Sequence, residues 1–364
     1  MNFSTTRVNS SELNEGNYIS TENMLQDYQG IVDAKSVPED VNVISFSCGD
    51  ILISNIRPYL KKVWKATYNG GCSSDVFVLK ANDNIESDYL HYVIANDKFI
   101  NFVMSGAKGV KMPRGDKNQM KTYSLSLPQI QEQKKIGKML SLLDERIATQ
   151  NKIIEDLKKL KSAISKLLFT RKDLLETTIR LADIATLKNG YAFQSSKYNI
   201  LGKWKILTIA NVSGGRYINE EDCNCIINLP NDIQDHQVLK EGDILISLTG
   251  NVGRVSLCKS GAYLLNQRVG LLQIEGNIDK EFLYQVLSSR RFENSMVACG
   301  QGAAQMNIGK GDVENFVLPY SSNANNNHLV ARILHSYDKC IINELRELTL
   351  LTIQKQYFLA QMFI

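Results

Sequence analysis

The chain contains an internal repeat, which limits its possible folds more than any other sequence feature. The string Gly-Asp-Ile-Leu-Ile-Ser occurs at residues 49–54 and again, letter for letter, at 242–247. The same separation of 193 residues, or one of 194, relates further pairs along the chain: Leu90 and Leu283, Phe99 and Phe292, Asp144 and Asp338, Lys161 and Lys355. Matches that keep one separation over such a span indicate a tandem duplication. Any fold for this chain must therefore contain two copies of the same structural unit.

Each copy has a mixed segment followed by a long helical one. The mixed segments, 1–128 and 173–327, combine turn residues, short runs of branched apolar residues and helical spacing over 88–104 and 280–297. Strands are also expected over 75–79 and 268–274. We predict an α+β fold for each mixed segment. The long helices are predicted over 129–172 and 328–364, with Leu127-Pro128 and Leu318-Pro319 marking where they start.

Both helical segments have the heptad pattern of a coiled coil, with apolar residues alternating at spacings of four and three. Polar residues occupy matching seam positions, Gln150 with Glu344 and Lys161 with Lys355. We expect the two helices to pair as an antiparallel coiled coil, because the first helix connects directly to the second domain. The residues predicted for this pairing are Ile136, Leu140, Leu143, Ile147, Ile154, Leu157, Lys161, Leu334, Tyr337, Ile341, Leu348, Leu351 and Lys355. The alternative is that each helix packs only on its own domain.

Charge and cysteine content exclude several classes of protein. Lys and Arg number 42 against 38 Asp and Glu, so the chain is not a histone-like polycation. The mixed segments carry net charges of −1 and −2, whereas residues 129–170 carry +4. No apolar run is long enough to span a membrane, and the seven cysteines lack CxxC spacing. A cytoplasmic protein with free thiols is expected.

Basic and amide residues are grouped locally within the near-neutral mixed segments. Lys and Arg suit phosphate contacts, whereas Asn, Gln and Arg form paired hydrogen bonds with base edges. These groups predict contacts with double-stranded DNA, although each could also be a solvated polar loop. The candidate DNA-binding residues are Arg57, Lys61, Lys62, Lys108, Lys111, Arg114, Lys117, Asn251, Arg254, Gln267, Arg268, Gln301, Gln305, Asn307 and Lys310.

No motif predicts catalysis or metal binding. The segment 302–311 fails the phosphate-loop spacing, because Ala304 and Gly311 occupy positions that require Gly and Ser or Thr. The four histidines are scattered without a nucleophile motif. Cys223 and Cys225 lack the second ligand pair that a closed zinc site requires. The sequence therefore favours a non-catalytic, metal-free chain.

The combination of features resembles the specificity subunit of type I restriction-modification systems. Residues 127–136 read Leu-Pro-Gln-Ile-Gln-Glu-Gln-Lys-Lys-Ile, similar to the start of that family's conserved spacer helix. The Gly-Asp-Ile-Leu-Ile-Ser strand and Arg180-Leu181-Ala182-Asp183-Ile184 also look like the family. The resemblance covers essentially the whole chain.

The resemblance implies a scaffold without an active site. Each mixed segment would be a target recognition domain reading one half of a split DNA sequence. The helices would set the gap between the halves and dock two methyltransferase subunits, and motor-nuclease subunits would join. Adenine methylation and cleavage would take place in these partners, which would bind S-adenosylmethionine, ATP and Mg²⁺.

Two departures from the family pattern stand out. The first copy has no counterpart to residues 180–184, and the second helix lacks the Glu-Gln pair, so one docking site is expected to differ from the other. A competing hypothesis from another class is a coiled-coil adaptor whose two domains bind proteins rather than DNA.

Overall fold

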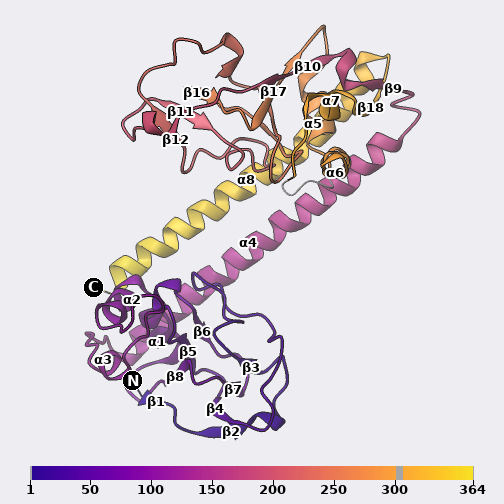
Figure 1. Cartoon of the computed structure of the whole chain (residues 1–364). Coiled ribbons are helices and arrows are strands. Elements are labelled where there is room, and N and C mark those ends of the chain that lie inside the picture. The colour runs from indigo at the N-terminus through magenta and orange to yellow at the C-terminus, as the bar shows by residue number, and fades with distance from the viewer. Residues whose placement is uncertain (1, 301–305, 364) are drawn as a thin grey trace. The chain divides into compact units, whose positions relative to one another are not determined.

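The computed structural model describes residues 2–300 and 306–363. The chain divides into two compact units, of which unit 1 comprises residues 1–151 with 347–364 and unit 2 comprises 152–346. Each unit contains an α+β domain and one segment of each of two long helices, α4 (Ile130–Thr170) and α8 (Ala324–Met362). Both helices are labelled in Figure 1.

The domain of unit 1 contains two four-stranded sheets and three helices. The sheet orders are β1-β8-β5-β6 and β2-β4-β7-β3. The elements are β1 (Asn2–Phe3), β2 (Arg7–Asn9), η1 (Ser10–Glu12), β3 (Tyr18–Ile19), β4 (Asn42–Phe46), β5 (Ile51–Ser54), η2 (Pro58–Leu60), β6 (Val63–Lys65), β7 (Gly70–Cys72), β8 (Val76–Lys80), α1 (Ser87–Ile94), α2 (Asp97–Ser105) and α3 (Lys117–Lys121).

The domain of unit 2 contains two four-stranded sheets, β10-β17-β14-β15 and β12-β11-β16-β13, and the pair β18-β9. The elements are β9 (Thr177–Arg180), η3 (Leu181–Asp183), β10 (Ala185–Asn189), η4 (Ser195–Lys197), β11 (Trp204–Leu207), β12 (Asn224–Ile226), η5 (Asp235–Gln237), β13 (Val238–Leu239), β14 (Ile244–Ser247), β15 (Val255–Leu257), β16 (Tyr263–Leu265), β17 (Val269–Ile274), α5 (Lys280–Leu287), α6 (Arg290–Cys299), α7 (Lys310–Glu314) and β18 (Val317–Tyr320).

The duplication is visible in the strand pairing. The sheet β1-β8-β5-β6 has the same order and antiparallel pairing as β10-β17-β14-β15. The three strands β4-β7-β3 likewise match β13-β16-β11, including one parallel pair in each set. The domains differ in the fourth strand of that second sheet, since β2 pairs with β4 whereas β12 pairs with β11. The tandem α+β fold predicted from the repeat is thus confirmed.

The repeated hexapeptide forms a turn and a central strand in both units. Gly49 and Gly242 have φ of +91° and +80°, a conformation that glycine adopts without steric cost. The carboxylate of the following Asp accepts a backbone N–H of the turn, from Ser47 in unit 1 and from Lys240 in unit 2. All residues of β5 and β14 are buried, so each central strand anchors its core.

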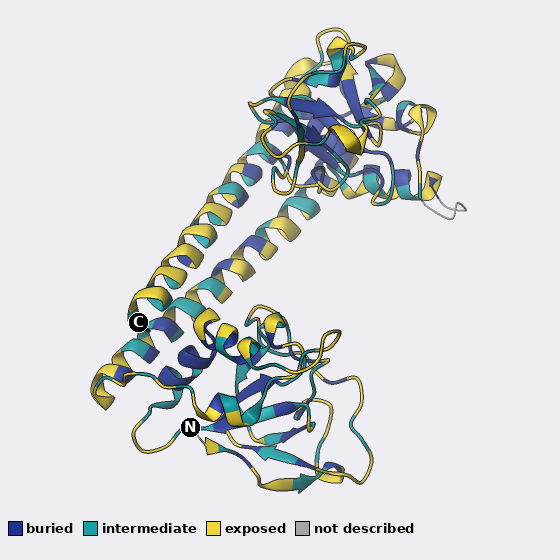
Figure 2. Cartoon of the chain, turned by 60° about the vertical axis from the view of Figure 1, so that its left-hand side comes forward, coloured by how far each residue is buried: buried dark blue, intermediate teal, exposed yellow. Residues whose placement is uncertain are grey.

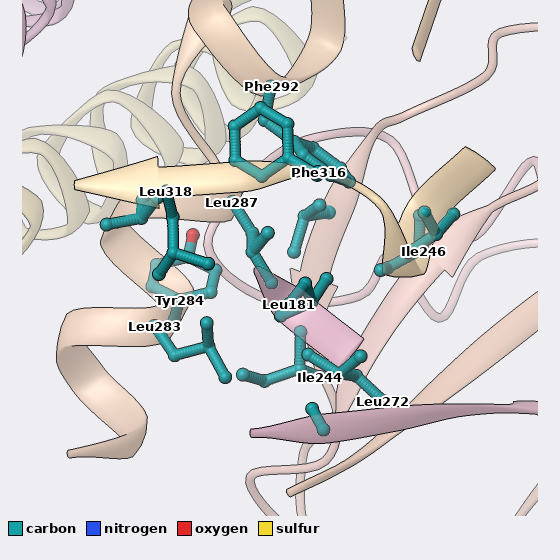
Figure 3. Close-up of a cluster of buried hydrophobic side chains, with 14 of the residues drawn as sticks. Leu181, Ile244, Ile246, Leu272, Leu283, Tyr284, Leu287, Phe292, Phe316 and Leu318 are labelled. Carbon is teal, nitrogen blue, oxygen red and sulfur yellow. The ribbon is translucent and has the colours of Figure 1, made fainter. Parts of the chain in front are cut away.

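The core of unit 2 lies between the β14 sheet and helices α5 and α6. Ile244 and Ile246 of β14 pack with Leu272 of β17 and with Leu283, Leu287 and Phe292 of the helices, as Figure 3 shows. Both long helices in Figure 2 carry dark buried residues beside yellow exposed ones, the amphipathic pattern expected for helices that cover a core on one face.

The sequence misplaced the start of the second long helix and did not reveal a break within each of two helical spans. The spans 88–104 and 280–297 each form two helices rather than one. The first breaks before α2, where the Asn96 side chain accepts the Lys98 N–H, and the second before α6, where the Ser289 hydroxyl accepts the Phe292 N–H. Leu318-Pro319 lies in strand β18, and helix α8 begins at Ala324 rather than 328. The side-chain oxygen Oδ1 of Asn323 accepts the Asn325 N–H at this earlier start.

Within each unit the two long helices pack against each other as well as on the domain. In unit 1 Asp144 pairs with Lys355 and Arg146 with Glu347, so the helices run antiparallel. In unit 2 Lys161 pairs with Asp338 at 2.6 Å. The residues predicted for helix pairing are all buried or half-buried. The helices therefore both pair with each other and pack on the domains, since Leu140 also joins the core of unit 1.

Gln133 of the Glu-Gln pair is a buried anchor of helix α4. Its side-chain oxygen accepts the Glu86 N–H, and its amide donates to the Asn84 and Pro128 carbonyls. Asn327, at the matching position of α8, bonds to both the N–H and the carbonyl of Ser321. The amide therefore ties each helix start to its own unit, and the second copy keeps this role without the Glu-Gln pair.

Gly137 marks a close approach of α4 to α1. An added Cβ would lie 2.7 Å from the Asp88 Cβ and 3.0 Å from the Tyr89 nitrogen. Gly to Ala normally stabilises a helix interior by about 1 kcal/mol, but overpacking costs about 1–3 kcal/mol. We expect Gly137→Ala to lower the stability of unit 1, measured as faster hydrogen exchange of β5. The control Thr149→Ala, at an exposed site on α4, should not. Slower exchange in Gly137→Ala would contradict the close approach.

Candidate nucleic-acid interface

In both domains, the same pair of backbone hydrogen bonds joins the segment after the repeated strand, β5 or β14, to the loop that precedes a short helix, α3 or α7. In unit 1 the Gly115 N–H donates to the Asn55 carbonyl and the Arg57 N–H donates to the Pro113 carbonyl. In unit 2 the equivalent bonds run from Ile308 to Leu248 and from Gly250 to Met306. Each of these positions is related to its counterpart by 193 residues. The repeat therefore preserves a frame that places one loop next to another.

In unit 1 this frame gathers four exposed cations, Arg57, Lys108, Lys111 and Arg114, which we name the basic edge. Arg57 adopts a left-handed conformation with φ of +50°, directly after β5. Lys108 pairs with Asp116 at 3.0 Å, and Arg114 lies 3.5 Å from Asp75. Grouped, solvent-accessible cations of this kind can bind the phosphates of a nucleic acid backbone.

Asp116 offsets part of this positive charge and also caps helix α3. It accepts hydrogen bonds from the Lys108 ammonium and from the backbone N–H groups of Asn118 and Gln119 at the start of α3. The Lys108 bond and these two N–H groups hold the pKa of Asp116 below its usual range. The carboxylate thus stays ionised as the cap of α3.

Three other predicted cations of unit 1 have intramolecular partners. Lys61 pairs with Asp97 at 2.9 Å, and the Lys62 ammonium donates to the Thr21 carbonyl. Burial lowers the pKa of Lys62, and its bond to the Thr21 carbonyl directs the ammonium to the chain itself rather than to a phosphate. The Lys117 ammonium lies 4.8 Å from the centre of the Phe3 ring. These residues stabilise the domain around the basic edge.

In unit 2 the same frame gathers mostly neutral groups. Asn251, Gln267, Arg268 and Asn307 are exposed, and we name them the polar edge. The Leu248 N–H donates to the Arg268 carbonyl, and Thr249 forms an isolated antiparallel β-bridge with Asn307. Such side chains can make paired hydrogen bonds with base edges. Gln301 and Gln305, also predicted to contact DNA, lie outside the described residues.

The remaining predicted cations of unit 2 are paired with carboxylates. Arg254 is half-buried and lies 3.8 Å from Glu293, and Lys310 lies 3.7 Å from Glu314. Lys310 follows Ile308 closely and is more exposed than Arg254, so it is the better placed of the two beside the polar edge.

A buried ionic cluster joins the α+β domain of unit 2 to the helices. Asp338 of α8 accepts from Lys161 of α4, from Arg216 at 3.0 Å and from the Gln285 amide at 2.6 Å. Arg216 also binds Glu281 through two bonds of 2.6 and 2.8 Å. We name these residues the polar junction. The repeat signals Lys161 and Asp338, but the junction could not be predicted from the sequence because Arg216 lies in a loop without a repeat signal.

The basic edge should supply most of the salt-dependent binding of unit 1. In a variant with Lys108, Lys111 and Arg114 replaced by Ala, the slope of log affinity for duplex DNA against log salt should become shallower by roughly 2.7, at about 0.9 per phosphate contact. Filter binding between 50 and 200 mM salt would measure it. A control variant with Lys35→Ala and Lys61→Ala should leave the slope unchanged. If the slope changed by the same amount per removed charge in both variants, the basic edge would not be the phosphate-binding surface.

Comparison with known proteins identifies the family. The profile of the type I restriction modification DNA specificity domain matches residues 4–159 and again 176–352, most of the chain and one match per repeat. The chain therefore belongs to the type I restriction-modification DNA specificity family. Its similarity to that family covers both recognition domains and much of both helices.

Relatives and solved structures agree with this membership. The MjaVIII type I restriction enzyme specificity subunit of Methanocaldococcus jannaschii is 31% identical over 253 residues, 62% of this chain and 58% of the relative. The MjaX specificity subunit of that organism is 27% identical over 305 residues, 77% of this chain and 70% of the relative. The matched region thus spans less than two thirds of the first relative's length.

Two solved structures share the fold. The type I restriction-modification S subunit from M. genitalium is 17% identical, with a TM-score of 0.59 and coverage of 100% of this chain and 96% of that one. A chain from a structural study of complex assembly and conformational transition in the type I R-M system is 18% identical, with a TM-score of 0.58 and coverage of 99% and 94%. None of these comparisons supports the protein-binding adaptor. Across the described residues, no helix is long and apolar enough to cross a membrane.

Proposed function

We propose that this chain is the DNA sequence-specificity subunit of a type I restriction-modification complex, with each domain reading one half of a bipartite target. The observation that supports the proposal most directly is the duplicated frame, which holds an exposed basic edge in unit 1 and an exposed polar edge in unit 2. Phosphate contacts position a protein on DNA, and amide and guanidinium groups distinguish bases. One such domain in each repeat suits a target with two separate halves.

The long helices would set the gap between the two halves and dock two methyltransferase subunits, with motor-nuclease subunits completing the complex. Exposed apolar residues on α4 and α8, such as Leu160, Leu350 and Tyr357, support a docking role for the helices. The chain itself would be non-catalytic and would direct adenine methylation and cleavage. S-adenosylmethionine, ATP and Mg²⁺ would act in the partner subunits.

The test is selective binding by the full chain purified with its methyltransferase partner. The methylated motif of cells that carry the system supplies the target duplex. Binding should be about 10³-fold or more tighter than to a scrambled duplex, and should weaken as salt rises. Duplexes with the gap lengthened by one or two base pairs should bind at the scrambled level. Equal affinity for the target and scrambled duplexes would overturn the proposal.

A further inference from the structure

The loop between α2 and α3 of unit 1 forms a short, anchored hairpin. Lys108 and Arg114 exchange both backbone hydrogen bonds, each 2.9 Å long. Gly109 has φ of +98°, and a Cβ there would lie 3.2 Å from the Met112 carbonyl oxygen, so glycine suits this tight turn. The frame bonds from Arg57 to Pro113 and from Gly115 to Asn55 hold its base. Residues 108–114 thus form a hairpin whose base is tied to the domain by backbone hydrogen bonds.

The tip of this hairpin is apolar although its flanks are basic. Val110 is fully exposed, at 102% of its reference accessibility, and Met112 is 48% exposed. Lys108, Lys111 and Arg114 are their near neighbours in the sequence, and Lys111 has no ion pair among the described residues. Single exposed aliphatic residues are common on protein surfaces. Val110, however, is a β-branched residue at the tip of a hairpin whose base is anchored and whose sequence is rich in cations, so it presents an apolar side chain on a surface that attracts phosphates.

Duplex DNA offers one apolar group for such a probe to recognise. The major groove admits a two-stranded β-ribbon, and each base pair there presents hydrogen-bonding groups except for the C5-methyl group of thymine. Valine can make no side-chain hydrogen bond, so the methyl group is the feature it can distinguish. Cations on both sides of the tip would contact phosphates flanking the groove.

We propose that Val110 is a specificity-determining residue of the first recognition domain and contacts a thymine methyl group in the first half of the target. This inference rests on the proposed function and assigns a base contact within it. The counterpart in unit 2 includes residues outside the described ranges, so the inference concerns unit 1 alone.

The test replaces thymine with uracil, which removes the methyl group and keeps base pairing. With the full chain and its methyltransferase partner, uracil at one thymine of the first half should lower affinity about 4-fold, equivalent to ~0.8 kcal/mol for one buried methyl group. Val110→Ala should bind the thymine duplex about 4-fold more weakly and should no longer distinguish thymine from uracil. Its thermal unfolding should match the wild type, because the Val110 side chain is exposed.

Val32→Ala is the matched control, since Val32 is a valine of the same domain with 51% exposure. This variant should keep both the affinity and the uracil penalty. A uracil penalty that is equal in the wild type and in Val110→Ala, or a first half without thymine, would overturn the inference while leaving selective binding intact. Loss of all selectivity in the wild type would instead overturn the proposed function.

Discussion

Replacing residues 173–327 with the corresponding segment of another specificity subunit should change one half of the recognised sequence and leave the other half unchanged. Affinity for the original target should fall to the non-specific level, roughly 10³-fold or more. Affinity should be restored on a duplex that combines the original first half with the donor's second half. The methylated motif of cells carrying the exchanged chain, together with binding to the four combinations of halves, would measure this result.

The physical reason is that the strands of this segment pair only with one another. The three sheets of unit 2 are formed by strands β9 to β18, all between Thr177 and Tyr320. The segment can therefore be exchanged without removing a strand from unit 1. The core does extend onto the helices, since Leu168, Phe169 and Leu334 pack with it. The donor segment must supply apolar residues that fit these helix positions.

The polar junction sets a second condition on the exchange. Asp338 and Lys161 remain in the chain, whereas Arg216 and Gln285 are exchanged. A donor segment that has Arg and Gln at the positions of Arg216 and Gln285 should give a folded chain. The control starts from a donor segment that lacks them and does not fold, and restores only Arg216, Glu281 and Gln285. If both halves of the target changed in a folded exchange, the domains would not read independently.

The sequence was sufficient for the large features of the fold because those features depend on periodicity. The repeat predicted two domains of one fold, and the heptads placed Ile136, Leu140 and Leu334 on the inner side of long helices. Helix boundaries could not be predicted where a single capping residue determines them. Asn96 and Ser289 each break a helix whose apolar spacing continues across the gap, so periodicity alone could not reveal either break.

Local grouping of basic and amide residues predicted a DNA-binding surface, but only some of the predicted residues lie on the basic and polar edges. The sequence grouped Lys61 and Lys62 with Arg57, but their ammonium groups turn to Asp97 and to the Thr21 carbonyl. Lys108, Lys111 and Arg114 come together with Arg57 through backbone bonds that no side-chain pattern encodes. Val110 was overlooked because an apolar residue in a basic loop has no periodic partner, although Gly109 before it signals a turn.

Replacing Asp338 with Ala should destabilise unit 2 by about 3–5 kcal/mol, the cost of breaking a buried ion pair. Asp338 is 6% exposed, and its carboxylate is the shared acceptor for Lys161, Arg216 and Gln285. Without it, Arg216 keeps Glu281, but the Lys161 ammonium remains in a largely buried position without its carboxylate. Hydrogen exchange of β14 in unit 2 should become faster, whereas exchange of β5 in unit 1 should not change.

An exposed pair of unit 2 supplies the control for this variant. Glu155 and Lys159 form an ion pair one turn apart on α4, with both side chains more than 60% exposed. Glu155→Ala removes the same charge from a helix of the same unit, and its effect on stability should be much smaller than that of Asp338→Ala because solvent screens such pairs. Asp338→Asn separates charge from shape, since it keeps hydrogen-bond acceptance but not the negative charge. If Asp338→Ala and Glu155→Ala had equal effects, the polar junction would not stabilise the attachment of the second recognition domain to the helices.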